Sequence, residues 1–260
     1  MEIPETRYVR SGEIAIAYQV HGSGAHDILF SGSTASNVET VWTLPEAHRL
    51  FERLGRFARV IRFDRRDTGV SDPIKDDLTL EAHAADALAV LDAAGSERPV
   101  FLGALDGARS LVTLAAMQPQ RVGGLIAVLA TARGAVDASE IADSVVRSLV
   151  DLDWPAGIVA MWAPEWSQDP VRRDRLTRYI RTSATPRQAA RLLQLSLTSD
   201  ISEVLPLVQA PTLVLRPRDA PMPAEPVREF ARLIPGAEFR EIAGDSVGAL
   251  YALDVTSSRT

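Results

Sequence analysis

The sequence of 260 residues predicts an α/β fold in which helices cover both faces of a mainly parallel sheet. Two observations carry this prediction. Short apolar runs bounded by glycine, proline or polar residues alternate with segments whose apolar positions recur at helical spacing. This alternation stops once, between about residues 135 and 205, where only helical patterns continue.

Seven segments have the composition of strands, since they are short and rich in apolar or β-branched residues. They are residues 14–20, 26–32, 59–67, 98–104, 122–130, 210–217 and 237–244. No helical pattern separates the first two, so we expect these two strands to pair antiparallel. The later strands alternate with helices and are expected to run parallel.

Four helices are predicted between these strands, at residues 45–57, 79–95, 107–118 and 224–236. In the second helix, the apolar positions from Ala84 to Leu91 follow helical spacing, and Gly95 is a typical C-terminal stop. Pro119 ends the third helix, because proline has no N–H to continue the helical hydrogen bonds. These helices are long enough to cover the faces of a sheet.

The segment 135–205 is predicted to be a helical cap inserted into a core made of residues 1–134 and 206–260. Four prolines divide it into short helices, and it carries three of the four tryptophans of the chain. Packing inside the cap accounts for these tryptophans. The alternative is that they line a ligand pocket under the cap, and Trp162 is the candidate for that role.

Composition excludes several classes of function. The net charge is −6 and the pI is about 5.3, which does not favour a surface that binds nucleic acid. The chain has no cysteine, so it lacks disulfides, thiolate nucleophiles and cysteine zinc sites. No apolar run reaches the ~18 residues of a membrane span. The N-terminal residues do not resemble a secretory signal, so a cytoplasmic location is expected.

Four segments resemble the α/β-hydrolase superfamily. They are RFDRRDTGVSD (62–72), VFLGALDGA (100–108), AAMQPQRVGGLIAV (115–128) and VLPLVQAPTLVLRPRD (204–219). The resemblance spans essentially the whole chain and implies a mostly parallel, eight-stranded sheet flanked by helices. The cap resembles hydrolase-like domains at the N-terminus of bacterial class III adenylate cyclases and transcriptional regulators. That resemblance implies an output domain or a protein partner of the cyclase or regulator type.

The resemblance places Leu105 where an α/β-hydrolase carries its nucleophilic serine, between Gly103 and Gly107. Leucine offers no lone pair for attack, so the covalent step is lost there. One alternative shifts the turn by one residue and makes Asp106 the nucleophile, as in haloalkane dehalogenases. Otherwise Asp106 is an acid favoured by the helix dipole. Ser110 lies one turn further on and is expected to point away from the turn.

The general base of the fold is a histidine late in the chain, and the corresponding stretch AGDSVGALY (243–251) contains none. The four histidines, His21, His26, His48 and His83, all lie in the first third and are interpreted as surface or capping residues. Their spacing fits no metal site, so no metal and no cofactor are expected.

Three further features can be placed by the resemblance. Asp219 occupies the position of the catalytic acid, and without a histidine to orient we interpret it as a relic or a loop-capping residue. The backbone N–H groups of Gly32 and Ser33 lie where an oxyanion would be held. Asp67 stands where the family has glycine in its Asp-Arg-Arg-Gly segment, and aspartate tolerates the positive φ of that turn better than most residues.

From these losses the sequence favours a non-catalytic module that senses a small apolar ligand or binds a protein. Its pocket would be lined by Gly32, Ser33, Leu105, Asp106 and Trp162. The alternative is a hydrolase that acts on an ester-like or other small apolar substrate by an unconventional mechanism, with Asp106 as nucleophile. A third reading is a structural homodimerisation module whose pocket is filled.

Overall fold

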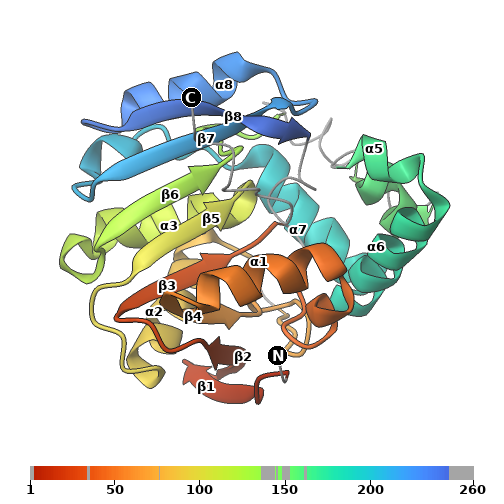
Figure 1. The fold of residues 1–260 in the computed structure, drawn as a ribbon, viewed down its shortest axis with the longest axis horizontal. Coiled ribbons are helices and arrows are strands. Elements are labelled where there is room, and N and C mark those ends of the chain that lie inside the picture. Colours follow the sequence, from red (N-terminus) through yellow and green to blue (C-terminus); the bar gives the residue numbers. More distant parts are fainter. Residues whose placement is uncertain are drawn as a thin grey trace.

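The computed structural model describes residues 3–33, 36–75, 77–135, 144, 146–147, 153–160 and 163–245, with the side chains of residues 244 and 245 left out. An eight-stranded sheet in the order β1-β2-β4-β3-β5-β6-β7-β8 forms its centre (Figure 1). The strands are β1 (Arg7–Ser11), β2 (Ile14–His21), β3 (His26–Ser31), β4 (Ala58–Phe63), β5 (Val100–Ala104), β6 (Gly124–Val128), β7 (Thr212–Asp219) and β8 (Glu238–Asp245). This confirms the predicted eight-stranded α/β architecture.

The sheet has an antiparallel edge and a parallel remainder. β2 pairs antiparallel with both β1 and β4, whereas the pairs from β4 through β3, β5, β6 and β7 to β8 are parallel. The expected antiparallel pairing of segments 14–20 and 26–32 is therefore wrong. The chain leaves β3 through helix α1 (Pro45–Gly55) and returns as β4, which takes the place between β2 and β3.

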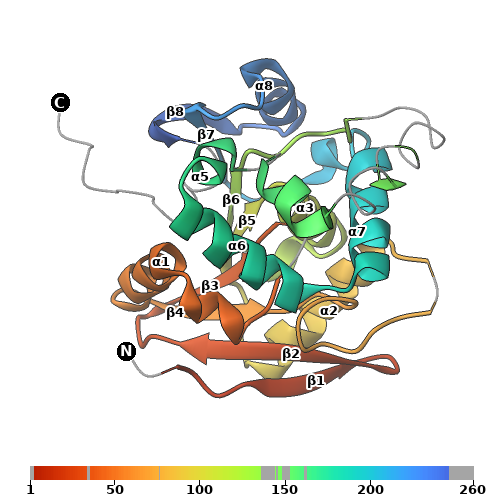
Figure 2. The ribbon, with the colours of Figure 1, turned by 90° about the vertical axis from the view of Figure 1, so that its right-hand side faces the viewer.

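Helices flank the sheet and close one end of it. Besides α1, the sheet is flanked by α2 (Leu80–Ala93), α3 (Asp106–Met117) and α8 (Ala224–Leu233). The hydroxyl of Thr79 begins α2 by accepting from the Ala82 N–H at 3.1 Å. Between β6 and β7 lie helical residues 153–160, α5 (Pro164–Ser167), α6 (Pro170–Ser183) and α7 (Pro186–Thr198), here called the helical insertion. Figures 1 and 2 show α5, α6 and α7 at the end of the sheet where the parallel strands finish.

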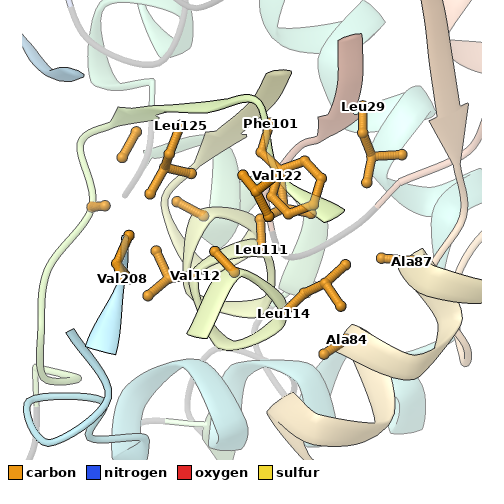
Figure 3. Packing of buried hydrophobic residues seen from close by; sticks show 14 of the residues in the cluster. Leu29, Ala84, Ala87, Phe101, Leu111, Val112, Leu114, Val122, Leu125 and Val208 are labelled. Atoms are coloured by element: carbon orange, nitrogen blue, oxygen red, sulfur yellow. The ribbon is translucent and has the colours of Figure 1, made fainter. Parts of the chain in front are cut away.

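The core consists of two apolar clusters, one on each face of the sheet, because successive strand side chains point to opposite faces. Leu29 and Phe101 belong to the cluster that packs against α2, α3 and α8 (Figure 3). Their strand neighbours Phe30 and Leu102 belong to the other cluster, which includes α1 and the helical insertion. No helix within the described ranges combines the length and apolar character needed to cross a bilayer.

Candidate active site

The turn from β5 into α3 has its apex at Leu105, whose φ of 51° and ψ of −126° lie outside the usual regions for a residue with a side chain. Such a conformation costs about 1–3 kcal/mol and persists only where its surroundings enforce it. Here the Leu105 N–H donates to the Val128 carbonyl at 2.9 Å. Asp106 is already the first helical residue, so the one-residue shift that would put Asp106 at the apex is wrong.

The two glycines of this turn are small because backbone segments cross there. A Cβ on Gly103 would lie 2.5 Å from the Ala108 Cα, and one on Gly107 would lie 1.8 Å from the Gly32 carbonyl oxygen. The start of α3 is thus packed directly on the loop that follows β3. This contact brings Gly32 beside the turn, as the resemblance implies.

Arg65, in the loop after β4, forms a buried ion pair with Asp106 and also binds the loop after β3. The Arg65 Nη1 donates to Asp106 Oδ2 at 3.0 Å, and its Nη2 donates to the Ser33 carbonyl at 2.9 Å. The side chains of Arg65 and Asp106 are only 2% and 7% exposed. Arg65 therefore sets the position of the carboxylate relative to the loop. Sequence reasoning quoted the Arg-Arg pair but did not place Arg65 in the site.

The second arginine of the pair points elsewhere. Arg66 forms a two-pronged contact with Asp86 of α2, with distances of 2.8 and 2.6 Å. Asp86 is fully buried. This contact fixes the loop after β4 to α2, while Arg65 of the same loop faces the turn.

The predicted site residues fall into three groups. Gly32, Ser33, Leu105 and Asp106 come together at the turn through the contacts above. Asp219 is exposed at the end of β7, and its side chain has no hydrogen bond or ion pair with any residue in the described ranges. Trp162 lies outside the described residues.

The histidines differ from the prediction in part. His21 and His83 are buried, so their interpretation as surface or capping residues is wrong. The His21 ring packs edge-on against Trp42 at 5.3 Å, and its Nε2 lies 3.1 Å from the Phe51 carbonyl. His83 Nδ1 and Ser110 Oγ are 3.4 Å apart, so Ser110 faces α2 and not the turn.

No group of three or more histidine, aspartate or glutamate side chains within the described ranges is arranged to hold a metal ion. Asp106 directly follows the apex residue in the sequence, and its carboxylate forms an ion pair with Arg65. A carboxylate can act as a nucleophile or as a base, and an arginine can stabilise developing negative charge. This pair is the chemistry that the turn offers.

Burial also shifts the pKa of three side chains in the interior of the protein. It lowers the pKa of His21 to about 4, with the charge of Arg62 adding to the effect. It lowers the pKa of His83 well below the usual range, and Arg65 and Arg66 add to that effect. It raises the pKa of Asp64, which directly follows β4, to about 6.

These shifts predict a loss of stability in mild acid. Between pH 6.5 and 4 the unfolded chain binds more protons at His21 and His83 than the folded chain. The free energy of unfolding therefore decreases as the pH is lowered. Asp64 acts oppositely between pH 6 and 3.8, since its folded form binds the extra proton. Two histidines outweigh one aspartate, so the free energy of unfolding should fall by about 1 kcal/mol for each pH unit lowered between pH 6 and 4.

Urea unfolding at pH 7.0, 6.0, 5.0 and 4.5 would measure this slope. His83→Gln should flatten it, whereas His26→Gln, at an exposed position, should leave it unchanged. A slope that is the same in His83→Gln as in the unmodified chain would contradict a lowered pKa of His83 in the folded protein.

The fold and the turn define the class of this protein, which has the α/β-hydrolase fold. Among solved structures it is similar to a hydrolase from Pseudomonas aeruginosa PA01, with 21% identity and a TM-score of 0.80 over 94% of this chain and 92% of the other. It is also similar to the enol-lactonase from Burkholderia xenovorans LB400, with 22% identity and a TM-score of 0.79 over 95% of each chain.

A curated relative is more similar in sequence. The chain is 27% identical over 242 residues to a protein named putative carbamate hydrolase RutD from Caulobacter sp. (strain K31), and the match covers 88% of each chain. No protein-family model matches the chain.

These findings correct the predicted function. The relative and the structural neighbours are named as hydrolases, which points to a catalytic hydrolase and overturns the non-catalytic sensing or interaction module. The prediction rested on the leucine at the apex and on the missing late histidine, and it kept Asp106 only as an alternative. The fold pairs Asp106 with Arg65 against the same turn.

Proposed function

We propose that this chain hydrolyses a small, ester-like acyl substrate with Asp106 as the nucleophile. The observation that carries the proposal is the buried ion pair between Arg65 and Asp106, which lies at the turn that presents the nucleophile in α/β-hydrolases. A carboxylate can form a covalent intermediate and so divide one difficult step into two easier ones. The names of the relative and the neighbours, a carbamate hydrolase and an enol-lactonase, support attack on an acyl carbon.

The reaction would proceed in two steps, acylation of Asp106 and hydrolysis of the acyl-enzyme. A carboxylate oxygen of Asp106 attacks the acyl carbon, and the bond to the leaving oxygen breaks with its electron pair, which takes a proton from water. Water then attacks the acyl-aspartyl anhydride and its C–O bond breaks. One proton of this water stays with the released acid, the other neutralises the hydroxide left by the first step, and the carboxylate is restored. An anhydride is reactive enough that this second step places little demand on a general base.

Arg65 has a specific task in this scheme. Its guanidinium balances the carboxylate before attack, and the negative charge then moves to the oxygen of the tetrahedral intermediate. The guanidinium can stabilise that oxygen. Because Arg65 also holds the Ser33 carbonyl, it keeps the loop in place while the charge moves.

The surroundings of the turn favour an apolar substrate. Leu105 is 4% exposed and belongs to the same buried cluster as Trp154, Ile158 and Val159 of the helical insertion. A substrate must displace part of this contact to reach Asp106. We therefore expect small substrates with a compact apolar acyl group to be preferred over charged ones.

Isotope labelling tests the covalent step without any mutation. The unmodified chain would be incubated with p-nitrophenyl acetate or butyrate in H₂¹⁸O through many turnovers, and the peptide containing Asp106 would be weighed by mass spectrometry. We expect ¹⁸O in that peptide, because water attacks the anhydride partly at the Asp106 carbonyl. The peptide containing Asp92, an aspartate on α2, is the internal control and should stay unlabelled.

Two outcomes would contradict the proposal. Turnover without label at Asp106 would contradict an acyl-aspartyl anhydride that water opens at the Asp106 carbonyl. No turnover with any acyl ester would remove the hydrolase assignment itself. The cytoplasmic location, the output partner, the homodimer and the division into core and cap stay predictions.

A further inference from the structure

We infer that Asp67 and Arg191 form a clamp that holds α7 in a fixed position over the turn at Leu105. The inference starts from a residue that departs from the superfamily pattern. Asp67 stands where the pattern has glycine, it has a φ of 69°, and it is fully buried. A buried charge in a strained backbone conformation calls for a compensating contact.

The contacts of Asp67 lead to α7. Arg191 donates from Nε to Oδ2 at 2.9 Å and from Nη2 to Oδ1 at 2.7 Å, a two-pronged arrangement. Gln188, one turn earlier, donates to Oδ1 at 3.3 Å. The N–H of Ile74 donates to Oδ1 at 3.2 Å. The carboxylate is thus satisfied mainly by side chains of one helix.

Gln188 links this contact to the start of α7. Its side-chain oxygen accepts from the Thr185 N–H at 2.8 Å, and the Thr185 hydroxyl accepts from the Gln188 N–H at 3.4 Å, which forms a capping box. The neighbouring Gly69 N–H also donates to the Ser183 carbonyl at 2.7 Å. The loop after β4 therefore holds the first half of α7 through Asp67 and the end of α6 through Gly69.

The other end of α7 is attached by a second arginine. Arg109 of α3 donates to the Ser196 carbonyl at 2.6 Å and to the Ser199 hydroxyl at 2.7 Å. Arg109 lies three residues after Asp106. Hence α7 spans from the loop that supplies Arg65 to the helix that supplies Asp106.

The face of α7 between these attachments is apolar. Leu192, Leu193 and Leu197 are buried in the cluster that contains Leu105. With both ends attached, α7 forms a fixed wall beside the turn. That this wall borders a substrate site rests on the proposed function, whereas the clamp itself does not.

Hydrogen–deuterium exchange with a double-mutant cycle tests the clamp. Asp67→Gly relieves the backbone strain but removes the contact, and Arg191→Met removes the partner. We expect each variant to speed exchange in the first half of α7 about tenfold and to leave α8 unchanged. The double variant should exchange no faster than either single variant, because both remove the same interaction.

Two further variants keep the result interpretable. Arg187→Met, on the same helix at an exposed position with no ion pair to any described residue, should leave exchange in α7 as it is. Arg191→Lys keeps the charge without the two-pronged geometry and should give an intermediate effect. If a Met or Gly variant does not fold, the Lys variant still tests the geometry.

The clamp would be overturned by slower or unchanged exchange in α7 of Asp67→Gly, which is the result expected if only strain matters at this position. Additive effects in the double variant would overturn it as well. Exchange is measured without substrate, so a failure of the hydrolysis assay would not affect this test.

Discussion

Replacing Asp106 with asparagine is expected to lower kcat/KM for p-nitrophenyl esters by about 10³-fold or more, as loss of a nucleophile does in other hydrolases. The amide has the size of the carboxylate but cannot attack the acyl carbon. It also leaves Arg65 without its anion in a site where both side chains are buried. Steady-state kinetics with the acetate and butyrate esters would measure the loss.

Stability must be followed in the same variant, since an unpaired buried charge costs about 3–5 kcal/mol. Circular dichroism would establish that Asp106→Asn is folded at the assay temperature. Asp92→Asn is the matched control, because Asp92 also pairs with an arginine, Arg121, but at a largely exposed site. Activity in Asp106→Asn equal to that of the unmodified chain would show that another group attacks the substrate.

Gly107→Ala is expected to lower the free energy of unfolding by about 3 kcal/mol or more. The added Cβ would lie 1.8 Å from the Gly32 carbonyl oxygen and 2.7 Å from that of Ser31. Both are backbone atoms, so no side-chain rotation relieves the overlap. The helix propensity of alanine recovers only about 1 kcal/mol.

Gly124→Ala provides the comparison. Its added Cβ would meet no atom closer than the Pro211 carbonyl oxygen at 3.5 Å, which is ordinary van der Waals contact. Urea unfolding of both variants would give the two free energies. Equal losses would mean that the close approach of α3 to the loop after β3 is not a structural requirement.

Most of the fold could be predicted from the sequence because apolar periodicity is a local signal. The helix predicted at 79–95 is observed as Leu80–Ala93, and the strand predicted at 98–104 as Val100–Ala104. β1 was missed, since its sequence RYVRS is short, polar and mostly exposed. The predicted pairing of β2 with β3 was wrong, because the order of strands in a sheet depends on the path of the connecting segments. Local sequence patterns carry no information about that path.

The candidate site was predicted only in part for a similar reason. The residues of the turn follow one another in the chain, so Leu105 and Asp106 could be placed from a motif. Arg65 lies 41 residues before Asp106, and only the folded chain brings them to 3.0 Å. The arginine pair at 65–66 was the available signal, but sequence alone does not tell which arginine faces the turn.

The apolar cluster shared by Leu105, Trp154 and Val159 has a consequence for engineering the chain. The inserted helices cannot be excised as a separate module, because a shortened protein would expose oily side chains of the sheet to water and self-associate. For the same reason, exchanging this segment with that of a distant homologue would require matched changes around the turn beneath it.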